Sequence, residues 1–325
     1  MASRPRIFIA RYFPGDISDI VGDDYELDRH DDTIPLPHEE FLRRLVLADA
    51  AVAYGDAIDA DALAGATKLR VIADQWSGAG VDLDAARRRG IVVTTGGYEH
   101  DWIVPSEAEH AVGLLLAAAR RIPEADRFVK GGRWVQPEQS VRGLPGIGLA
   151  GKTLGILNGS RRTGVELVRR LQGWDLELLH HDSEPNAEMA ALGARPVGLD
   201  ELLRRSDFVV ILHGDWSRTD YQLGREELAT IKPGAIVVNV TRGTAIDEAA
   251  LIEAIRDGRV RGAGLDKLER QPRLTPGLDT LDQVVLTPHS DGSLLLEREH
   301  VFREMVSNCV AVLEGRRPTK EVTAP

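Results

Sequence analysis

Residues 152–164 read KTLGILNGSRRTG, and residues 176–182 read LELLHHD. The first stretch is an apolar run that leads through Gly159 into a segment with helical spacing, which extends to Leu171. The second is another apolar run that ends on Asp182, 23 residues after Gly159. A strand, a glycine turn, a helix and a second strand ending on a carboxylate are typical of a dinucleotide-binding βαβ unit. The stretch therefore predicts an open parallel α/β sheet.

The glycine turn departs from the G-x-G-x-x-G pattern at two places. Gly159, Arg161 and Gly164 occupy the three glycine slots, and an apparent extra residue, Asn158, precedes them. The second slot is normally glycine because the backbone there approaches a pyrophosphate closely. The Arg161 side chain either points outward and leaves the phosphate site usable, or occupies phosphate space and weakens binding. Asp182 would meet the ribose hydroxyls and favour NAD over NADP, because a carboxylate repels a 2′-phosphate.

Strand-like and helix-like runs alternate over the whole chain, which predicts parallel sheets. Strands are expected at 6–10, 68–73, 91–94, 153–157, 176–181, 208–212, 235–240, 262–265 and 284–286. Helices are expected at 83–89, 106–120, 164–171, 199–205 and 248–257. In the helix at 106–120, Ser106 is a candidate N-cap, with Glu107 and Glu109 in the first turn. We therefore expect an α/β protein of two Rossmann-like domains, the smaller one built from both termini.

The expected domains have definite bounds. Residues 1–101 and 293–325 would form a flavodoxin-like substrate domain, and residues 102–292 a dinucleotide-binding Rossmann domain. A segment near 121–150 is rich in glycine and proline and is expected to form an extended arm. A chain of 325 residues exceeds one ordinary core, in agreement with two domains.

The composition disfavours several classes of partner. A net charge of −11 disfavours nucleic acid and anionic membranes. The longest apolar stretch, 111–119, is too short for a membrane span, and the first residues lack a secretory apolar run. The single cysteine, Cys309, rules out an intrachain disulfide and fits a reducing compartment. We expect a cytoplasmic protein that acts on a small molecule.

Three short segments of the last third carry candidate chemistry: NVTRG at 239–243, GAGLD at 262–266 and LTPH at 286–289. The first and third follow β-rich apolar runs and present Arg242 and His289. In an open parallel sheet, ligands bind beyond the carboxyl ends of the strands, so both side chains would face one cleft. A guanidinium binds a carboxylate through two hydrogen bonds, and an imidazole donates protons near neutral pH. This pair suits reduction of a 2-keto acid.

From about residue 45 to 320 the sequence resembles the D-isomer-specific 2-hydroxyacid dehydrogenases, which carry N-x-x-R-G and T-P-H segments. The resemblance implies that Arg242 binds the substrate carboxylate and carbonyl, that His289 is the general acid/base, and that the cofactor is NAD. The family's third catalytic residue, a Glu before a Pro, is replaced here by Gln271. A Gln can still accept a hydrogen bond from a ring N–H, but it lacks the charge that stabilises the imidazolium. The resemblance also implies a homodimer, with the arm near 121–150 in the contact.

The resemblance assigns the other site residues. Cofactor contacts would come from Gly159, Arg161, Arg162, Thr163, Gly164, Asp182, Thr241 and Asp266. Substrate contacts would come from Gln75, Trp76, Ser77 and Gly78, in a loop whose backbone amides hold the substrate carboxylate in the family. Asp266 could instead cap the next segment, and Trp76 could pack between domains. Lys267 is a charge where the family tends to have an apolar residue.

The departures at Arg161, Gln271 and residues 75–80 leave two functions open. The leading one is an NAD-dependent oxidoreductase that transfers hydride between NAD(H) and a 2-keto or 2-hydroxy acid. The alternative is a diverged, non-redox member: a ligand-sensing or protein-binding module, or altered chemistry on the same Arg and His. No metal is expected. The histidines that lack metal-ligand spacing, and are interpreted as structural, are His110, His180, His181 and His213.

Overall fold

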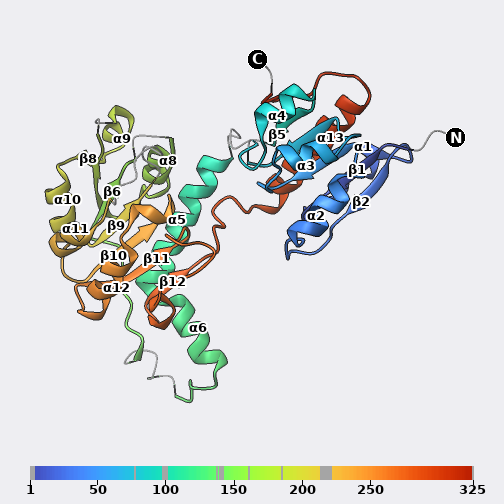
Figure 1. Ribbon diagram of the computed structural model, residues 1–325. Coiled ribbons are helices and arrows are strands. Elements are labelled where there is room, and N and C mark those ends of the chain that lie inside the picture. Colours follow the sequence, from blue (N-terminus) through green and yellow to red (C-terminus); the bar gives the residue numbers. More distant parts are fainter. Residues whose placement is uncertain are drawn as a thin grey trace. The chain divides into compact units, whose positions relative to one another are not determined.

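The computed structural model describes residues 4–76, 78–96, 102–136, 138, 143–159, 162–183, 186–212 and 222–323. The chain divides into two compact units, which are considered one at a time (Figure 1). The terminal unit comprises Met1–His100 and Ser293–Pro325, and the central unit comprises Asp101–Gly292. Three residues singled out in the sequence, Ser77, Arg161 and His213, lie outside the described residues.

The terminal unit is built on a five-stranded parallel sheet. Its strands are β1 (Arg6–Ile9), β2 (Glu26–Arg29), β3 (Ala50–Ala53), β4 (Val71–Asp74) and β5 (Val92–Thr95). Their order, β2-β1-β3-β4-β5, is that of flavodoxin-like sheets. The inner strands β3 and β4 are buried throughout, as expected of a parallel sheet that is covered on both faces.

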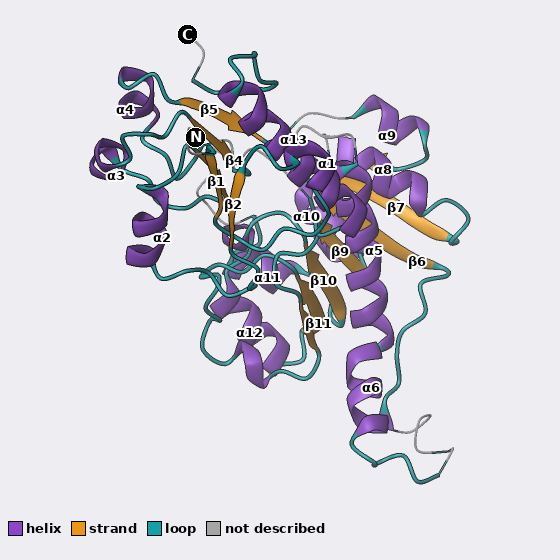
Figure 2. Cartoon of the chain, turned by 90° about the vertical axis from the view of Figure 1, so that its right-hand side faces the viewer, coloured by secondary structure: helices purple, strands orange, loops and turns teal. Residues whose placement is uncertain are grey.

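Helices cover both faces of this sheet (Figure 2). One face carries α2 (His38–Leu45), α3 (Ala60–Gly65) and α4 (Leu83–Arg88), and the other carries α1 (Ser18–Val21) and α13 (Leu295–Leu313). Under the first group, Phe41, Leu63 and Ala86 from the helices pack with Phe8 and Ile72 from the strands. Apolar side chains on both faces of the strands therefore account for the two helical layers.

The central unit contains a seven-stranded parallel sheet. Its strands are β6 (Lys152–Leu157), β7 (Leu176–His181), β8 (Arg195–Pro196), β9 (Phe208–Ile211), β10 (Ala235–Asn239), β11 (Val260–Leu265) and β12 (Val284–Leu286). They lie in the order β12-β11-β10-β9-β6-β7-β8. The order reverses between β6 and β9, and such a switch point is where open α/β sheets bind ligands.

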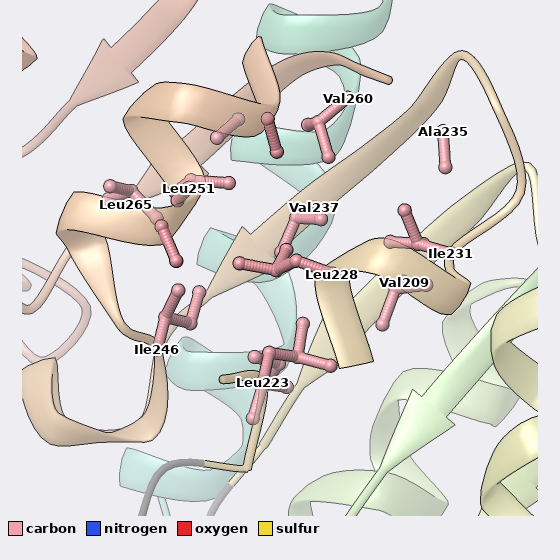
Figure 3. Close-up of a cluster of buried hydrophobic side chains, with 14 of the residues drawn as sticks. Val209, Leu223, Leu228, Ile231, Ala235, Val237, Ile246, Leu251, Val260 and Leu265 are labelled. Atoms are coloured by element: carbon pink, nitrogen blue, oxygen red, sulfur yellow. The ribbon is translucent and has the colours of Figure 1, made fainter. Parts of the chain in front are cut away.

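Two helical layers enclose this sheet as well. One layer holds α5 (Ile103–Arg120), α8 (Arg162–Arg170) and α9 (Ala187–Ala191), and the other holds α10 (Leu199–Arg205), α11 (Arg225–Thr230) and α12 (Glu248–Arg256). Short 3₁₀ turns lie at Gly243–Ala245 and Leu278–Thr280. Figure 3 shows the second layer's core, where Leu228 and Leu251 of the helices pack with Val209 and Val237 of the sheet.

The predicted fold class is confirmed: the chain forms two Rossmann-like units with parallel sheets, and both termini build the smaller one. Each expected strand and helix overlaps an observed one. The observed elements that were not among the expected ones are β2, β3, β8, α1, α2, α3, α9, α11, α13 and the helix α6 at Ile122–Lys130. β2 reads ELDR and is an edge strand with exposed or half-buried side chains, so it lacks the apolar pattern of a strand. No described helix is long and apolar enough to cross a membrane.

The expected start of the long helix at Ser106 was wrong. α5 begins at Ile103 with Trp102 in the N-cap position, so Ser106 and the acidic residues after it lie beyond the first three helical positions. Pro105 is compatible with this earlier start because backbone N–H groups in the first turn have no intrahelical partner. The Ser106 hydroxyl instead donates a hydrogen bond to the backbone oxygen of Asp291.

The expected extended arm is helical in its first part. Residues Ile122–Lys130 form α6, which follows α5 after Arg121. Arg121 adopts a left-handed conformation, with φ of 54°, and ends α5 there. Pro123 lies in the first turn of α6, where its missing N–H costs nothing. The glycine-rich composition thus describes only the later part of the segment.

Candidate active site

Three loops at one edge of the central sheet carry the predicted catalytic residues. Arg242 follows β10, Gln271 follows β11 and His289 follows β12. These three strands are neighbours and run parallel, so their carboxyl ends share one edge (Figure 1). The fold therefore brings together residues up to 47 positions apart in the sequence.

Asn239 shapes the loop that carries Arg242. Its Nδ2 donates to the backbone oxygen of Arg242 at 2.9 Å, and its Oδ1 accepts from the backbone N–H of Thr241 at 3.1 Å. Gly243 allows this loop to approach the next one, because a Cβ there would lie 2.0 Å from the backbone oxygen of Leu268. The half-buried Arg242 side chain is thus carried by a loop with little freedom.

His289 is held in a left-handed backbone conformation, with φ of 55°. Its backbone N–H donates to the backbone oxygen of Asp266 at 2.9 Å, which helps to fix that conformation. Its ring Nδ1 lies 3.2 Å from Nε2 of Gln271. An amide N–H that donates to Nδ1 leaves the ring proton on Nε2, the nitrogen that remains for a substrate. Gln271 and His289 are therefore in contact as predicted, but the amide nitrogen faces the ring, whereas the amide oxygen was expected to accept from a ring N–H.

Asp266 is buried and organises the loop that carries His289. Its Oδ1 accepts from the Thr287 hydroxyl at 2.6 Å and from the Ser290 N–H at 2.8 Å, and lies 3.1 Å from Nε2 of His110. Burial alone would raise the pKa of Asp266, but hydrogen bonds from His110, Thr287 and Ser290 outweigh it and hold the pKa well below its usual range. The alternative that Asp266 fixes the following segment agrees with these bonds, and a cofactor contact remains a prediction.

His110 was missed as a site residue because its spacing in the sequence supported only a structural interpretation. It lies on α5, and its Nε2 is 3.1 Å from Oγ1 of Thr287, 177 residues away. No spacing within the sequence predicts a contact between His110 and Thr287. A useful signal would have been the packing of α5 against β10, β11 and β12, which only the fold reveals.

The predicted dinucleotide turn is tight enough to require glycine. A Cβ on Gly164 would lie 2.0 Å from the backbone oxygen of Gly159, so the start of α8 crosses the turn at close range. Asn158 accommodates the apparent extra residue in a left-handed conformation, with φ of 58°, which asparagine tolerates better than most residues. Its side chain donates to Oε1 of Gln222. The close approach of Gly164 to Gly159 is the packing that a dinucleotide-binding turn requires of these two glycines.

Other predicted cofactor residues border this turn. Thr163 is buried, and its hydroxyl donates to Oε2 of Glu107 at 2.9 Å. Arg162 lies at the start of α8. Asp182 directly follows β7 and accepts a hydrogen bond from the Ser183 N–H at 2.7 Å. Thus Asp182 lies at the carboxyl end of the strand next to β6, the place where a ribose carboxylate is expected.

The predicted substrate loop, in the terminal unit, is held by Asp74. This buried carboxylate accepts from the N–H groups of Gly55 at 2.7 Å, Trp76 at 2.9 Å and Gly78 at 2.8 Å. The Gln75 N–H donates to the backbone oxygen of Ala53 at 3.1 Å. These amides make hydrogen bonds within the protein, and a contact between the loop and a substrate carboxylate remains a prediction. Asp74, which the sequence analysis did not single out, sets the loop conformation.

Trp76 packs within its own unit. Its ring meets that of Tyr54 edge-on, with centroids 5.8 Å apart, and the Arg298 guanidinium lies 5.6 Å from the Tyr54 centroid. Gln75 is buried, and its Oε1 has no hydrogen-bond partner among the described residues. The loop therefore presents an aromatic surface at the carboxyl ends of β3 and β4.

The remaining histidines of the central unit form no recognisable cluster within the part of the chain that the structure describes. His180 is buried in β7, and neither ring nitrogen has a hydrogen-bond partner among the described residues. Nδ1 of His181 lies 3.0 Å from the backbone oxygen of Val197. Over the same described ranges, no group of three or more His, Cys, Asp or Glu side chains could hold a metal ion.

Comparison with known proteins agrees with this geometry. Residues 112–290 match the model of the D-isomer specific 2-hydroxyacid dehydrogenase, NAD binding domain. A glyoxylate reductase of Pyrococcus furiosus is 34% identical over 97% of this chain and 94% of its own length.

Solved structures give the same result. A Thermus thermophilus protein matches with a TM-score of 0.80 and 35% identity, covering 98% of this chain and 99% of its own. A 2-hydroxyacid dehydrogenase of Ketogulonicigenium vulgare matches with a TM-score of 0.73 and 26% identity, covering 98% of each chain. The chain therefore belongs to the D-isomer-specific 2-hydroxyacid dehydrogenase family and is an NAD-dependent oxidoreductase acting on 2-hydroxy and 2-keto acids.

Proposed function

We propose that the reaction uses Arg242 to anchor the substrate carboxylate, His289 to exchange the proton and Gln271 to orient the imidazole. The observation that carries this assignment is the 3.2 Å contact between Nε2 of Gln271 and Nδ1 of His289. It occupies one ring nitrogen and leaves Nε2 for the substrate. Arg242 follows β10 at the same edge of the sheet, two strands from β12. Its guanidinium offers two N–H donors to a carboxylate.

In the direction of reduction, bound NADH supplies the hydride. The Arg242 guanidinium holds the substrate carboxylate, and the doubly protonated His289 ring gives its Nε2 proton to the carbonyl oxygen as that oxygen becomes a hydroxyl. In this imidazolium Nδ1 is a donor, so the Gln271 amide turns to accept from it through Oε1, and the ring is left neutral with its proton on Nδ1. His289 regains the proton from solvent, so each turnover consumes one proton. In the reverse direction the unprotonated Nε2 accepts the hydroxyl proton.

The substrate class that we propose is a 2-keto acid with a side chain ranging from hydrogen to an aromatic group. The relative from Pyrococcus furiosus is a glyoxylate reductase, which makes glyoxylate the first substrate to try. We also propose that residues 75–78 contact the substrate. The apolar surface of Trp76 would then favour keto acids with larger side chains. NADH oxidation should be followed with glyoxylate, pyruvate and phenylpyruvate. Turnover of none of them, in protein that binds NADH, would favour a non-redox role.

We propose that the cofactor lies on the turn from Gly159 to Gly164 and the N-terminus of α8, with Asp182 on the ribose hydroxyls. The other proposed cofactor contacts are Arg161, Arg162, Thr163, Thr241 and Asp266. Fluorescence titration should show tighter binding of NADH than of NADPH, because a 2′-phosphate would face the Asp182 carboxylate. Equal or inverted preference would remove Asp182 from this role. Arg161→Gly should strengthen NADH binding, because glycine restores a close backbone approach at the phosphate turn. Weaker binding would contradict this and make Arg161 a phosphate ligand.

A homodimer is proposed through the segment near 121–150. Four large apolar side chains there are exposed in the single chain: Ile122 (52%), Val129 (50%), Trp134 (52%) and Val135 (75%). Such a group is typical of an interface. Light scattering should give twice the chain mass, and Trp134→Ser should shift it toward the monomer. Ile34→Ser, at a residue 70% exposed in the terminal unit, is the control that should leave the mass unchanged.

A cytoplasmic location is also proposed. It is supported by the use of one cysteine, Cys309, which is buried and cannot form an intrachain disulfide. Cell fractionation tests it.

A further inference from the structure

A buried ion pair joins the loops that carry Arg242 and His289. Nζ of Lys267 lies 2.6 Å from Oδ2 of Asp291, and each side chain is 6% exposed. The same Nζ donates to the backbone oxygen of Val240 at 3.0 Å. Two of the three ammonium protons are therefore used by protein groups, away from bulk water.

The three partners belong to three neighbouring strands. Val240 directly follows β10 and precedes Arg242 by two residues, whereas Asp291 follows His289 by two residues beyond β12. Lys267 follows β11, the strand between them. One cation thus connects the loop of the substrate anchor to the loop of the proton donor.

Both ends of the pair are fixed by further hydrogen bonds. Asn239 Nδ2 contacts the backbone oxygen of Lys267 at 3.4 Å. The Asp291 N–H donates to Oδ2 of Asp266 at 3.3 Å, and Oδ1 of Asp291 accepts from the Gly292 N–H at 3.0 Å. The backbone oxygen of Asp291 accepts from the Ser106 hydroxyl. Consequently neither charge can move without breaking several bonds.

Stability alone gives no reason for this pair. Removing two charges from water costs about as much as their attraction returns, so an apolar pair of the same volume is generally as stable or more so. The ion pair adds direction, since N–H···O bonds have a preferred length and angle that apolar contacts lack. A geometric role between the two loops fits that difference.

We propose that Lys267 and Asp291 are positioning residues that fix Arg242 relative to His289. The proposal rests on the roles assigned to those two residues in the proposed function. A keto acid must present its carboxylate to the first and its carbonyl oxygen to the second at the same time. A displacement of about 1 Å in such a constellation can lower turnover by about 100-fold.

The test compares four proteins: wild type, Lys267→Met, the double variant Lys267→Met with Asp291→Ala, and the control Lys232→Met. Lys232 belongs to the same unit and forms a comparable pair, 2.8 Å from Oδ1 of Asp207, but it is 39% exposed and lies three residues before β10. Glyoxylate reduction with NADH gives kcat and KM. Hydrogen exchange of residues 239–243 and 286–292, in the protein without substrate, measures the tether independently of activity.

Lys267→Met should lower kcat with glyoxylate by about 10- to 100-fold. It should also speed exchange in both segments together and leave the KM for NADH within about twofold. Its Tm should fall by roughly 5 to 10 °C, because Asp291 is left buried and unpaired. The double variant should regain most of the Tm but keep the fast exchange and low kcat. Lys232→Met should match wild type in kcat and in both segments.

Three outcomes would overturn the proposal. These are a kcat for Lys267→Met within about twofold of wild type, faster exchange in one segment only, and a double variant that recovers kcat together with Tm. Loss of the proposed function would look different. Wild type would then reduce no keto acid, or His289→Ala would match it, while the exchange data would still decide whether Lys267 couples the two loops.

Discussion

The two units place a buried carboxylate at the same position relative to their sheets, yet its pKa moves in opposite directions. Asp74 ends β4 in the terminal unit, and Asp266 directly follows β11 in the central unit. Burial raises the pKa of Asp74, and the three backbone N–H groups that it accepts from do not compensate. For Asp266, hydrogen bonds from His110 and Thr287 more than offset burial, and the pKa is lowered.

This difference in pKa indicates a different role for the sheet edge at which each carboxylate lies. Backbone amides around Asp74 shape a loop that presents an aromatic side chain, Trp76. Side-chain donors around Asp266 hold a loop that presents an ionisable group, His289. Imidazole and hydroxyl donors on a buried carboxylate favour its charged form, so the central edge keeps a fixed negative charge beside the proton donor. We therefore expect chemistry at the central edge and substrate selection at the terminal one.

The largest expected effect separates these two roles. His289→Ala should lower kcat for keto-acid reduction by about 100- to 10,000-fold, the usual cost of removing a general acid, while NADH binding persists. Trp76→Ala should change kcat by less than about tenfold and act mainly on KM and on the preference between glyoxylate and phenylpyruvate. Steady-state kinetics with both acids measures this. Equal losses of kcat in the two variants would erase the distinction between the edges.

Stability tests the two carboxylates directly. Asp266→Asn should lower the free energy of unfolding by about 3 to 5 kcal/mol, as expected when a charged member of a buried network is lost. Asp74→Asn should cost about 1 to 2 kcal/mol, because backbone hydrogen bonds to one oxygen persist. Urea unfolding at neutral pH gives both values. A larger loss for Asp74→Asn would contradict the ranking.

The same variants should differ in their pH dependence. A carboxyl with a raised folded-state pKa stabilises the fold most at low pH, and this stabilisation is lost as pH rises through that pKa. The loss of unfolding free energy caused by Asp74→Asn should therefore shrink between about pH 4.5 and 7, a range above the ordinary Asp pKa of roughly 4. A carboxyl with a lowered pKa contributes fully above about pH 4, so the Asp266→Asn penalty should stay constant over that window. Parallel curves for the two variants would show that their environments do not differ as described.

A carboxylate added at the central edge should shift proton transfer. Gln271→Glu places a negative charge beside the His289 ring and should raise the pKa of the imidazolium by roughly one unit. Because reduction requires the protonated ring, the fall of kcat/KM at alkaline pH should move to higher pH. Gln283→Glu, a charge change at the other end of β12, is the control and should leave the profile in place. An unmoved profile in Gln271→Glu would mean that its side chain does not touch His289 during turnover.

The smallest expected effect concerns a buried group without hydrogen-bond partners on its ring among the described residues. Burial lowers the pKa of His180, so its neutral form stabilises the fold above about pH 6.5, and that contribution is lost as pH falls toward the folded-state pKa. The loss reaches at most about 1.4 kcal/mol per pH unit. His180→Leu should flatten the stability curve between pH 5 and 6.5, about the range where histidine titrates. His181→Leu serves as the comparison, and equal flattening there would refute the assignment.

Periodicity and turn chemistry were sufficient for the fold class. Apolar runs of strand length separated by helical spacing fix the elements, and parallel order follows from their alternation. Residues 152–164 predicted the strand β6 and the helix α8 that the structure contains. β2 was not predicted, because an edge strand with exposed charges has no apolar pattern. The start of α5 was not predicted, because its first turn contains Pro105.

By itself the sequence determined that Arg242 and His289 follow strands of one sheet, because each stands just after an apolar run, whereas Gln271 was assigned from the resemblance to the family. Only the tertiary structure decided which groups hold them. His110 meets Thr287 across 177 residues, Ser106 meets Asp291 across 185, and Lys267 reaches Val240 across 27. Local propensity acts over a few residues, whereas these contacts depend on which strand ends become neighbours when the sheet forms. The candidate site residues could therefore be predicted from the sequence, but the hydrogen bonds that position them could not.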